Sequence, residues 1–328
     1  MKFNLSISVG ACMLALLGAC GGSDDPKSSA GNGPVAISSA NQSDVARASV
    51  NGGLSVALVQ NAAGSSTVAP GSMLAADRVL QHVLGEAMTR RKGIASASAH
   101  PAGTTSSVQA CAVSGTIATT WNDHDGDTLL SNGDVLTADF AQCHQSSTLS
   151  FNGTLVITLT GTPSAMAFKA DAVFQNVTVV HGGVSSTLKG TVSLDEVDTD
   201  TISSTTFTVG SGGLEETVSS PSYTDAIVFN AGTVVSSSYL AGTSSLTLNG
   251  SFSAQSIGGS VTISTPQPLY QRTGDAFPSS GQVLIAGAGG SKLLASVLDS
   301  SQVQLQVDAN GDGTYDSTTT VAWSALLP

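Results

Sequence analysis

Aspartates recur at alternate positions in one short segment of a chain in which only 10% of the residues are charged. The segment, residues 121–134, reads WNDHDGDTLLSNGD and contains no Lys or Arg to offset its carboxylates. Calcium is a hard cation that takes about six to eight oxygen ligands, and alternating side chains along a tight turn can direct several carboxylates inward. The segment is therefore a candidate calcium site. Its expected ligands are Asp123, Asp125, Asp127, Ser131 and Asp134.

The ligand spacing resembles the dockerin version of the EF-hand calcium loop. The first three aspartates would occupy positions 1, 3 and 5, Ser131 position 9 and Asp134 position 12, where dockerin loops carry Asp in place of Glu. The segment departs from that pattern at position 6, where Thr128 replaces the turn-forming Gly, and no helices are expected beside it. An acidic turn that binds no cation is the alternative interpretation.

A second segment with the same chemistry lies near the C-terminus. Residues 308–316 match the pattern D-x-[DN]-x-D-G-x-x-D, which resembles the calcium hairpins of integrin α-subunit propellers. A plain hairpin turn is the alternative, since Asn-Gly alone is a strong turn signal. We expect any calcium bound by either segment to be structural, with a dissociation constant of about 10⁻⁴ to 10⁻³ M. The expected ligands of this second site are Asp308, Asn310, Asp312 and Asp316.

Both segments lie between runs of alternating apolar and polar residues, so both are expected to be hairpin loops. In residues 167–180, for example, Ala170 and Ala172 alternate with Lys169 and Asp171. Similar runs, rich in Val, Thr, Ile and Phe, continue to the C-terminus. The sequence predicts a mainly β fold in which a long antiparallel meander forms a curved sheet, a half-barrel or a sandwich, preceded by a short helical N-terminal region. A parallel β-helix is the alternative, although no clean repeat period is evident.

The N-terminus resembles the signal sequence and lipobox of bacterial lipoproteins. A positive start precedes an apolar run that is too short to span a bilayer and that ends in LGAC, residues 17–20. The resemblance implies that residues 1–19 are removed, that Cys20 is acylated, and that Gly21 directs the chain to the outer membrane. An ordinary secretory signal is the alternative. The order of motifs along the chain is similar to that of uncharacterised lipoproteins of Gram-negative bacteria.

The two remaining cysteines of the exported chain, Cys111 and Cys143, are expected to form a disulfide in an oxidising compartment. If they face each other across the first hairpin, Trp121 faces Gly133 and residues 122–132 form the loop. In that register the apolar faces of the two strands do not coincide, so a bulge or a shifted register is possible. A zinc site is the alternative, but two Cys beside His144 make a poor ligand set.

Composition divides the chain into five segments. The first two are a signal peptide and a flexible tether that is rich in Gly, Ser and Pro, and a helical segment follows them. The helix expected over residues 72–92 begins after the N-cap Ser72 and ends in a basic cluster before Gly93. A Ser-rich linker leads into the β-domain. The boundaries are 1–19 for the signal peptide, 20–42 for the tether, 43–93 for the helical segment, 94–107 for the linker and 108–328 for the β-domain.

Net charge and motif content exclude several functions. The formal net charge is −12, which repels nucleic acid and anionic lipid. The chain contains neither G-x-S-x-G nor H-E-x-x-H. Ser186 and Lys189 match S-x-x-K, but on a strand they would face opposite sides. Acidic clusters around Asp195 and around Glu215 and Glu216 are expected to lie in polar turns. We therefore expect no enzymatic activity.

Two functional hypotheses remain. The first is an outer-membrane lipoprotein, anchored to the bilayer through acylated Cys20, whose calcium-stabilised β-domain acts as a structural or interaction module with a protein partner. The second is a periplasmic or surface carrier that binds an apolar ligand on a concave β-sheet. A carrier requires a sizeable apolar concavity, whereas a module can be packed solid.

Overall fold

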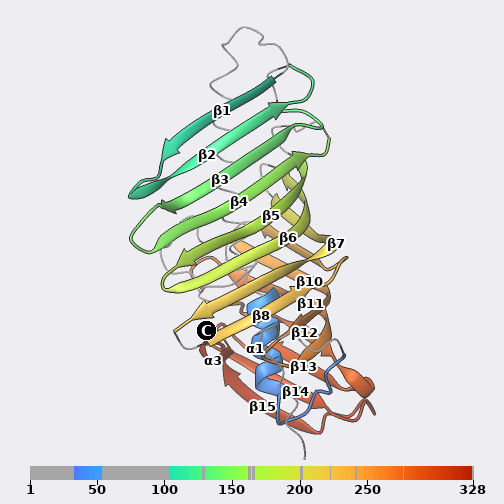
Figure 1. The fold of residues 1–328 in the computed structure, drawn as a ribbon. Helices are drawn as coiled ribbons and strands as arrows, with labels where there is room; N and C mark the ends of the chain where they lie inside the picture. Colours follow the sequence, from blue (N-terminus) through green and yellow to red (C-terminus); the bar gives the residue numbers. More distant parts are fainter. Residues whose placement is uncertain are drawn as a thin grey trace, which may run out of the picture.

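A single antiparallel sheet of fifteen strands forms the body of the protein. The computed structural model describes residues 33–53 and 103–326, except 128–129, 162–163, 165–166, 200–201, 222, 241 and 276. Figure 1 shows the strands following one another in chain order from β1 at the top to β15 at the bottom, with helix α1 beside the last strands. All pairings between these strands are antiparallel, which confirms the predicted meander and excludes a parallel β-helix.

All strands in the described part of the chain belong to this one sheet. Among the described residues, the helices are α1 (Gln42–Gly53), the 3₁₀ turn η3 (Ala288–Gly290) and α3 (Trp323–Leu326). The strands are β1 (Gly103–Ala110), β2 (Ser114–Asp123), β3 (Val135–His144), β4 (Leu149–Leu159), β5 (Ala167–His181), β6 (Val184–Asp198), β7 (Ile202–Ser220), β8 (Tyr223–Phe229), β9 (Val234–Leu240), β10 (Thr243–Ala254), β11 (Gly259–Arg272), β12 (Ser280–Ala286), β13 (Lys292–Val297), β14 (Gln302–Asp308) and β15 (Ser317–Ala322).

Strands β8 and β9 together act as one long strand that is broken in the middle. Both lie between β7 and β10: β8 pairs with one half of β7 and β9 with the other half, in the same direction. The strand pairing is interrupted by a turn between Asn230 and Thr233, in which Thr233 N–H donates to the carbonyl of Asn230 at 3.1 Å. The sheet therefore remains continuous from β7 to β10.

One face of the sheet is apolar and buried, as the alternating sequence predicts. On β5, Ala170, Ala172 and Phe174 are at most 1% exposed, whereas Lys169 and Asp171, on either side of Ala170, are exposed. The same alternation continues through the neighbouring strands. Helices α1 and α3 cover this face only near the end of the sheet, where α1 contacts β13 and β14.

A row of irregularities crosses the sheet from β2 to β12, and we call it the bulge seam. The register between neighbouring strands shifts at each crossing, which marks a β-bulge. Bulges bend a strand and increase its local twist, so a line of them curves the whole sheet. The seam consists of Gly115, Gln142, Gly153, Asn176, Gly190, Gly213, the break at residues 230–233, Gly250, Pro268 and Gly281.

Glycines and bulged residues alternate along the seam because the backbones approach closely there. Gly153 has φ +101°, and a Cβ at this position would lie 2.3 Å from the carbonyl oxygen of Asn176. A Cβ on Gly190, where φ is +134°, would lie 2.3 Å from the carbonyl oxygen of Gly213. Neither position can accept a side chain without a backbone shift.

The seam glycines on β2, β4, β6, β10 and β12 share a short local sequence. Each glycine is followed by a polar residue and then by a buried apolar residue, as in G-T-I, G-T-L, G-T-V, G-S-F and G-Q-V. The intervals between these tripeptides are unequal, which explains why the sequence gives no clean repeat period. The sheet is nevertheless built from repeating two-strand units.

The N-terminal part of the described chain corrects the predicted tether. Residues 33–41, expected to belong to a flexible segment, lie on the sheet: Val35 N–H donates to the carbonyl of Ser260 at 2.9 Å. Ile37 is 1% exposed, and its N–H donates to Ser291 Oγ. One buried apolar side chain and these bonds are enough to hold a segment whose composition is otherwise polar. The helix predicted over residues 72–92 lies outside the described residues, as does the rest of the tether.

The predicted linker is also too long at its C-terminal end. Residues 103–107, placed in the linker because of their Ser and Thr content, belong to β1. β1 pairs with β2 over its whole length, with Gly103 opposite Asp123. Backbone pairing with a regular neighbour thus decides the structure of a segment that has little to bury.

The predicted disulfide is confirmed, but the predicted register is wrong. Cys111 and Cys143 are bonded, with their Cα atoms 5.4 Å apart. Cys111 lies in the turn before β2 rather than opposite Cys143 in the ladder, and Trp121 pairs with Leu136. A register shift between Ser114 and Thr116 separates the disulfide from the regular part of the hairpin. The apolar faces of β2 and β3 coincide in this register.

Candidate metal-binding loops

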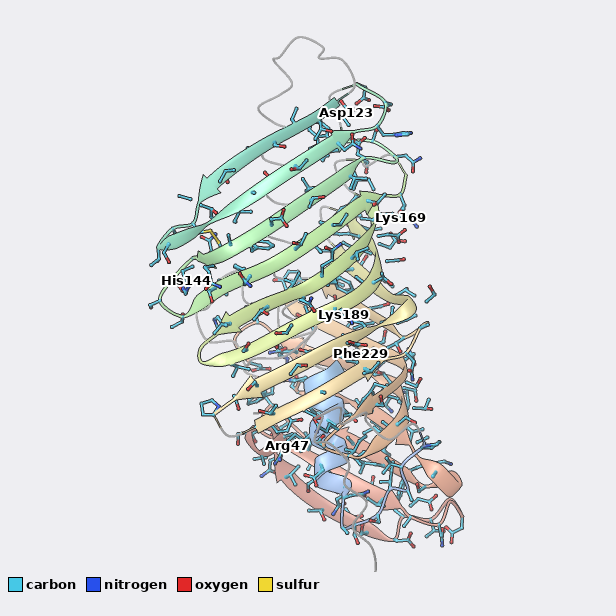
Figure 2. The ribbon with its side chains drawn as sticks, in the orientation of Figure 1. Arg47, Asp123, His144, Lys169, Lys189 and Phe229 are labelled. Carbon is cyan, nitrogen blue, oxygen red and sulfur yellow. A yellow bond between two sulfur atoms is a disulfide. The ribbon has the colours of Figure 1, made fainter. Side chains whose placement is uncertain are left out.

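The loop between β2 and β3 brings three of the predicted ligands together. Possible ligand atoms of Asp123, Asp125 and Asp134 all lie within 4.8 Å of one another. Asp123 is 7% and Asp134 1% exposed, whereas Asp125 faces solvent. The strands hold the two buried residues, because β2 ends at Asp123 and β3 begins directly after Asp134. Figure 2 shows Asp123 at this corner of the sheet.

Backbone N–H groups organise these carboxylates. Gly126 N–H donates to Asp123 Oδ1 at 2.6 Å, and Asp127 N–H donates to Asp125 Oδ1 at 3.2 Å. His124 N–H donates to Asp134 Oδ1 at 2.9 Å, which ties the end of the loop to its beginning. A carboxylate offers about four lone-pair positions, so each of these oxygens can still accept a cation.

Ser131 bonds to two of these acids, as predicted, whereas the side chain of Asp127 reaches Asp125 but lies outside the group of three mutually close acids. Ser131 Oγ donates to Asp125 Oδ2 at 3.0 Å, and Ser131 N–H donates to Asp134 Oδ2 at 2.9 Å. The carboxylate of Asp127 is exposed and lies outside the group formed by the other three acids. Thr128, the expected departure from the dockerin pattern, lies outside the described residues.

Hydrogen bonding lowers the pKa of one solvent-facing carboxylate in each loop, Asp125 in the first and Asp312 in the second. The backbone N–H of Asp127 is the largest cause that lowers the pKa of Asp125 below its ordinary value of 3.8, and Ser131 contributes in the same direction. In the second loop, the backbone N–H of Thr314 lowers the pKa of Asp312. Donors that favour the charged carboxylate also favour a site for a cation.

The loop between β14 and β15 contains the second set of predicted ligands. Asp308 is 1% exposed, and its two oxygens accept the N–H groups of Gly311 at 2.7 Å and Gly313 at 2.9 Å. Asp316 Oδ2 accepts the N–H of Ala309 at 2.7 Å. Among the described residues, a group of three metal-binding side chains within 4.8 Å occurs only in the first loop.

The two loops nevertheless share one hydrogen-bonding plan. Asp123 and Asp308 each accept the N–H of the glycine three residues later, and these glycines have φ of 75° and 76°. Asp125 and Asn310 each accept the N–H of the second residue after them, at 3.2 and 2.9 Å. The last aspartate of each loop accepts the N–H of the residue that follows the first aspartate. The pattern D-x-[DN]-G-D therefore produces the same turn twice.

The donor set of the first loop fits calcium. Calcium–oxygen distances of about 2.3–2.6 Å allow ligand atoms to be up to roughly 5 Å apart, which matches the three-carboxylate group. The oxygens are hard donors, and neither Lys nor Arg occurs in the segment to neutralise them. In the second loop, Asn310 Nδ2 donates to Asp312 Oδ2 at 3.0 Å, so this amide would have to rotate before its oxygen and Asp312 could share an ion.

The acidic residues expected in polar turns lie instead on strands. Asp195 on β6 accepts from Lys169 Nζ at 2.6 Å, and Glu215 on β7 lies 3.6 Å from Lys189 Nζ. Glu216, the next residue along β7, is on the buried face and is 2% exposed. Ion pairs on the exposed face, together with strand pairing, place these acids within the sheet rather than at its ends.

The S-x-x-K match is not a catalytic pair. Ser186 is 5% exposed and faces the core, whereas 63% of the Lys189 side chain is exposed on the other face of β6. Residues three apart on a strand point to opposite sides, as predicted.

The sequence did not predict a buried polar contact between β8 and the turn after β10. Asp225 is fully buried and accepts hydrogen bonds from Tyr223 Oη at 2.7 Å, Ser256 N–H at 2.9 Å and Ser256 Oγ at 2.5 Å. These donors satisfy the carboxylate, so Asp225 fixes the turn to β8. Its signal in the sequence, one Asp in an apolar strand, does not reveal its partners.

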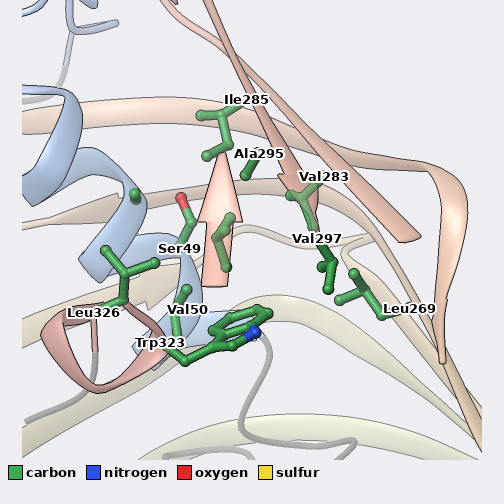
Figure 3. A pocket seen from close by; sticks show the side chains of 11 residues that line it. Ser49, Val50, Leu269, Val283, Ile285, Ala295, Val297, Trp323 and Leu326 are labelled. Atoms are coloured by element: carbon green, nitrogen blue, oxygen red, sulfur yellow. The ribbon is translucent and has the colours of Figure 1, made fainter. Parts of the chain in front are cut away.

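A narrow gap lies between α1, α3 and the end of the sheet. Figure 3 shows Ser49 and Val50 of α1 facing Trp323 and Leu326 of α3, with Leu269 and other strand residues behind them. The lining is almost entirely apolar, and the gap has room for about one water molecule. It is a packing defect rather than a ligand pocket.

Comparisons of the chain with protein-family models, with curated proteins and with solved structures find no match. In the described parts of the chain, no helix is both long and apolar enough to span a bilayer. Cys20 and the predicted lipobox lie outside the described residues.

Proposed function

We propose that this chain is a lipoprotein anchored to the outer membrane through acylated Cys20, and that its calcium-stabilised β-domain acts as a structural or interaction module. The observation that supports this function best is the occurrence of one loop design at two distant places in the sheet. The first loop joins β2 to β3, next to β1, and the second joins β14 to β15; β1 and β15 are the outermost of the described strands.

Loops in these positions would stabilise the sheet where it is weakest. A strand at the end of the described order has one bonded neighbour where a central strand has two, so the two ends of the sheet open most easily. An ion that bridges the first and last acids of a hairpin loop would hold its two strands together. The disulfide between Cys111 and Cys143 acts on the same hairpin as the first loop, and it also stabilises the β1 end of the sheet.

The buried apolar face supports a packed module rather than a carrier. Side chains such as Leu155, Ile157 and Phe207 are at most 2% exposed. A carrier of drug-sized or lipid ligands needs a cavity of roughly 300 Å³ or more, lined by accessible apolar groups. In the part of the chain that the structure describes, the gap beside Trp323 is far smaller than this.

The anchor is tested by metabolic labelling with palmitate in a Gram-negative host. The wild-type chain should incorporate the label and sediment with the outer membrane, whereas Cys20→Ser should do neither. Cys12→Ser is the matched control, because it removes a cysteine of the same apolar run and should leave labelling unchanged. Equal labelling of Cys20→Ser and the wild type would exclude the lipoprotein function.

The metal is tested by equilibrium dialysis of the purified chain against calcium. Binding with a dissociation constant of about 10⁻⁴ to 10⁻³ M is expected for loops of this kind. Asp125→Asn combined with Asp134→Asn should abolish the binding of one ion. No bound calcium at about 10 mM, well above that range, would exclude the metal site and leave two acidic turns.

A further inference from the structure

The outermost strand β15 presents an unprotected edge. Among the described residues β15 pairs with β14 alone, without a register shift along its 6 residues, most of which are exposed. An edge strand carries N–H and C=O groups that can pair with another strand, and proteins usually protect it with charges, proline or bulges. The sequence of β15, STTTVA, contains no charge or proline, and the bulge seam ends before it, at Gly281 on β12.

Alternate residues of β15 direct their backbone groups away from β14. Trp323 N–H, directly after the strand, donates to the carbonyl of Ser301, directly before β14, at 3.0 Å. Bonded and non-bonded positions alternate along an antiparallel ladder, so every second residue back from Trp323 bonds to β14. The residues between these positions, whose N–H and C=O groups point outward, are Thr318, Thr320 and Ala322.

The chemistry of this edge suits a second copy of the chain. No charged residue occurs in residues 317–328, so two chains of net charge −12 can approach each other here. Hydroxyl pairs already join neighbouring strands elsewhere on the sheet, for example Thr178 with Thr187 at 2.9 Å and Thr206 with Ser236 at 3.0 Å. Thr320 offers the same side chain to a second β15, so a cross-strand contact used within the sheet can be repeated between chains.

The acidic loop before β15 determines the orientation. Asp308, Asp312 and Asp316 lie in that loop, so parallel pairing would place two acidic loops side by side. Antiparallel pairing centred on Thr320 uses all the outward-facing residues of both copies. The Asp316 residues of the two copies are then about eight strand residues apart, roughly 27 Å, which is well beyond the screening length of about 8 Å.

The opposite end of β15 adds a basic group. Arg47 of α1 donates to the carbonyl of Ala325 in α3 at 3.1 Å, and 37% of its side chain is exposed. Antiparallel pairing brings the acidic loop of one copy toward this guanidinium of the other. Asp44, 4.0 Å from Arg47, and Asp299, in the turn before β14, offset part of the attraction. The separation of the two acidic loops is therefore the main determinant of the orientation.

We propose that two copies of the chain associate through β15 in an antiparallel, two-fold arrangement that joins their sheets into one. This inference rests on the proposed interaction module and names its partner as a second copy of the chain. Association of the chains can be measured without measuring acylation or bound calcium. A failure of this proposal is therefore distinguishable from a failure of the anchor or of the metal site.

The first test uses engineered cysteines in the full chain. Thr320→Cys lies on the expected two-fold axis and should give a covalent dimer on a non-reducing gel after mild oxidation, whereas the wild type should not. Thr318→Cys and Ala322→Cys should each cross-link poorly alone but well when mixed, because each faces the other across the axis. If Thr320→Cys cross-links no more than the wild type, the proposal is wrong. It is also wrong if Thr318→Cys and Ala322→Cys each cross-link alone as well as Thr320→Cys does, because that result indicates parallel pairing.

The second test measures association without a new covalent bond. An edge of this length buries less than a standard interface, so the dimer should be weak and depend on concentration. In sedimentation experiments the wild-type mass should rise toward that of two chains. Thr320→Lys should weaken association roughly ten-fold or more, because it places like charges opposite each other on the axis.

Val113→Lys is the matched control for this charge. It adds the same group to an exposed valine in the turn before β2, far from β15 in the strand order, and should associate normally. A wild type that remains monomeric at every concentration, or equal association of all three chains, would refute the proposal.

Discussion

Replacing Asp125 by Asn should remove the calcium-dependent stabilisation of the first loop. Asp125 contributes one of the three carboxylates within 4.8 Å, and it is the exposed member, so its amide fits without burying a new polar group. An ion that binds only the folded chain at about 100 times its Kd adds roughly 2.7 kcal/mol. For a domain of about 150–250 residues, 1 kcal/mol corresponds to roughly 2–4 °C in the melting temperature. Calcium should therefore raise the melting temperature of the wild type by about 5–10 °C per occupied loop.

The assay is thermal unfolding followed by circular dichroism, with calcium, with chelator, and with sodium chloride of the same ionic strength. Asp127→Asn is the control, since it makes the same change of charge in the same loop outside the three-carboxylate group. It should keep the calcium response, whereas Asp125→Asn should lose the part that belongs to the first loop. Magnesium should stabilise less, because it demands a smaller octahedral site. The assignment of ligands is wrong if sodium chloride raises the melting temperature of the wild type as much as calcium does. It is also wrong if calcium raises the melting temperatures of both variants by the same amount.

Three further predictions concern the sheet itself. Gly153→Ala should destabilise the chain by about 2 kcal/mol or more in urea denaturation, because φ is +101° and the new Cβ would meet a carbonyl 2.3 Å away. Cys111→Ser with Cys143→Ser should cost about 3–4 kcal/mol in the same experiment, for a closed loop of this length, and an unchanged midpoint would contradict it. Acid should lower the stability that both loops contribute to the fold. The pKa values of Asp125 and Asp312 are lower in the folded chain than their unfolded value of 3.8. The stability that these residues add is therefore present above pH 3.8 and is lost as the pH falls through their folded pKa values. Melts recorded from pH 6 to pH 2 should decline mainly below about pH 4, and a flat profile would refute this expectation.

The fold class could be predicted because the apolar residues alternate clearly in most strands. Phe168, Ala170 and Phe174 indicate the buried face of β5 without any structural information. Strands β7 and β9 could not be predicted in the same way, since Ser, Thr and Gly dominate β7, and three consecutive Ser residues interrupt the apolar pattern of β9. Their structure depends on backbone pairing with the neighbouring strands, which the residue pattern of a single strand does not encode.

The candidate site could be predicted in composition but not in detail. The spacing of aspartates indicated both loops and included Ser131, whose hydroxyl bonds to Asp125. It did not distinguish Asp127 from the three acids that lie within 4.8 Å of one another, because that depends on which side chains the turn directs toward Asp134. The register of the hairpin was wrong for a related reason: a disulfide fixes two residues in space, but not the bulge between them and the ladder.

The bulge seam gives the sheet a natural unit of length. Gly153 and Gly190 occupy equivalent places two strands apart, each followed by Thr and then by a buried apolar residue. Removing residues 153–189 would therefore bring Gly190 to the place of Gly153, opposite the bulge at Gln142, and would shorten the sheet by two strands with its curvature preserved. Because strands contact chiefly the strands they are bonded to, such a chain would lose little beyond the deleted unit. The length of the sheet from β1 to β15 can thus be changed by adding or removing whole hairpins, as the length of a solenoid can be changed by whole repeats.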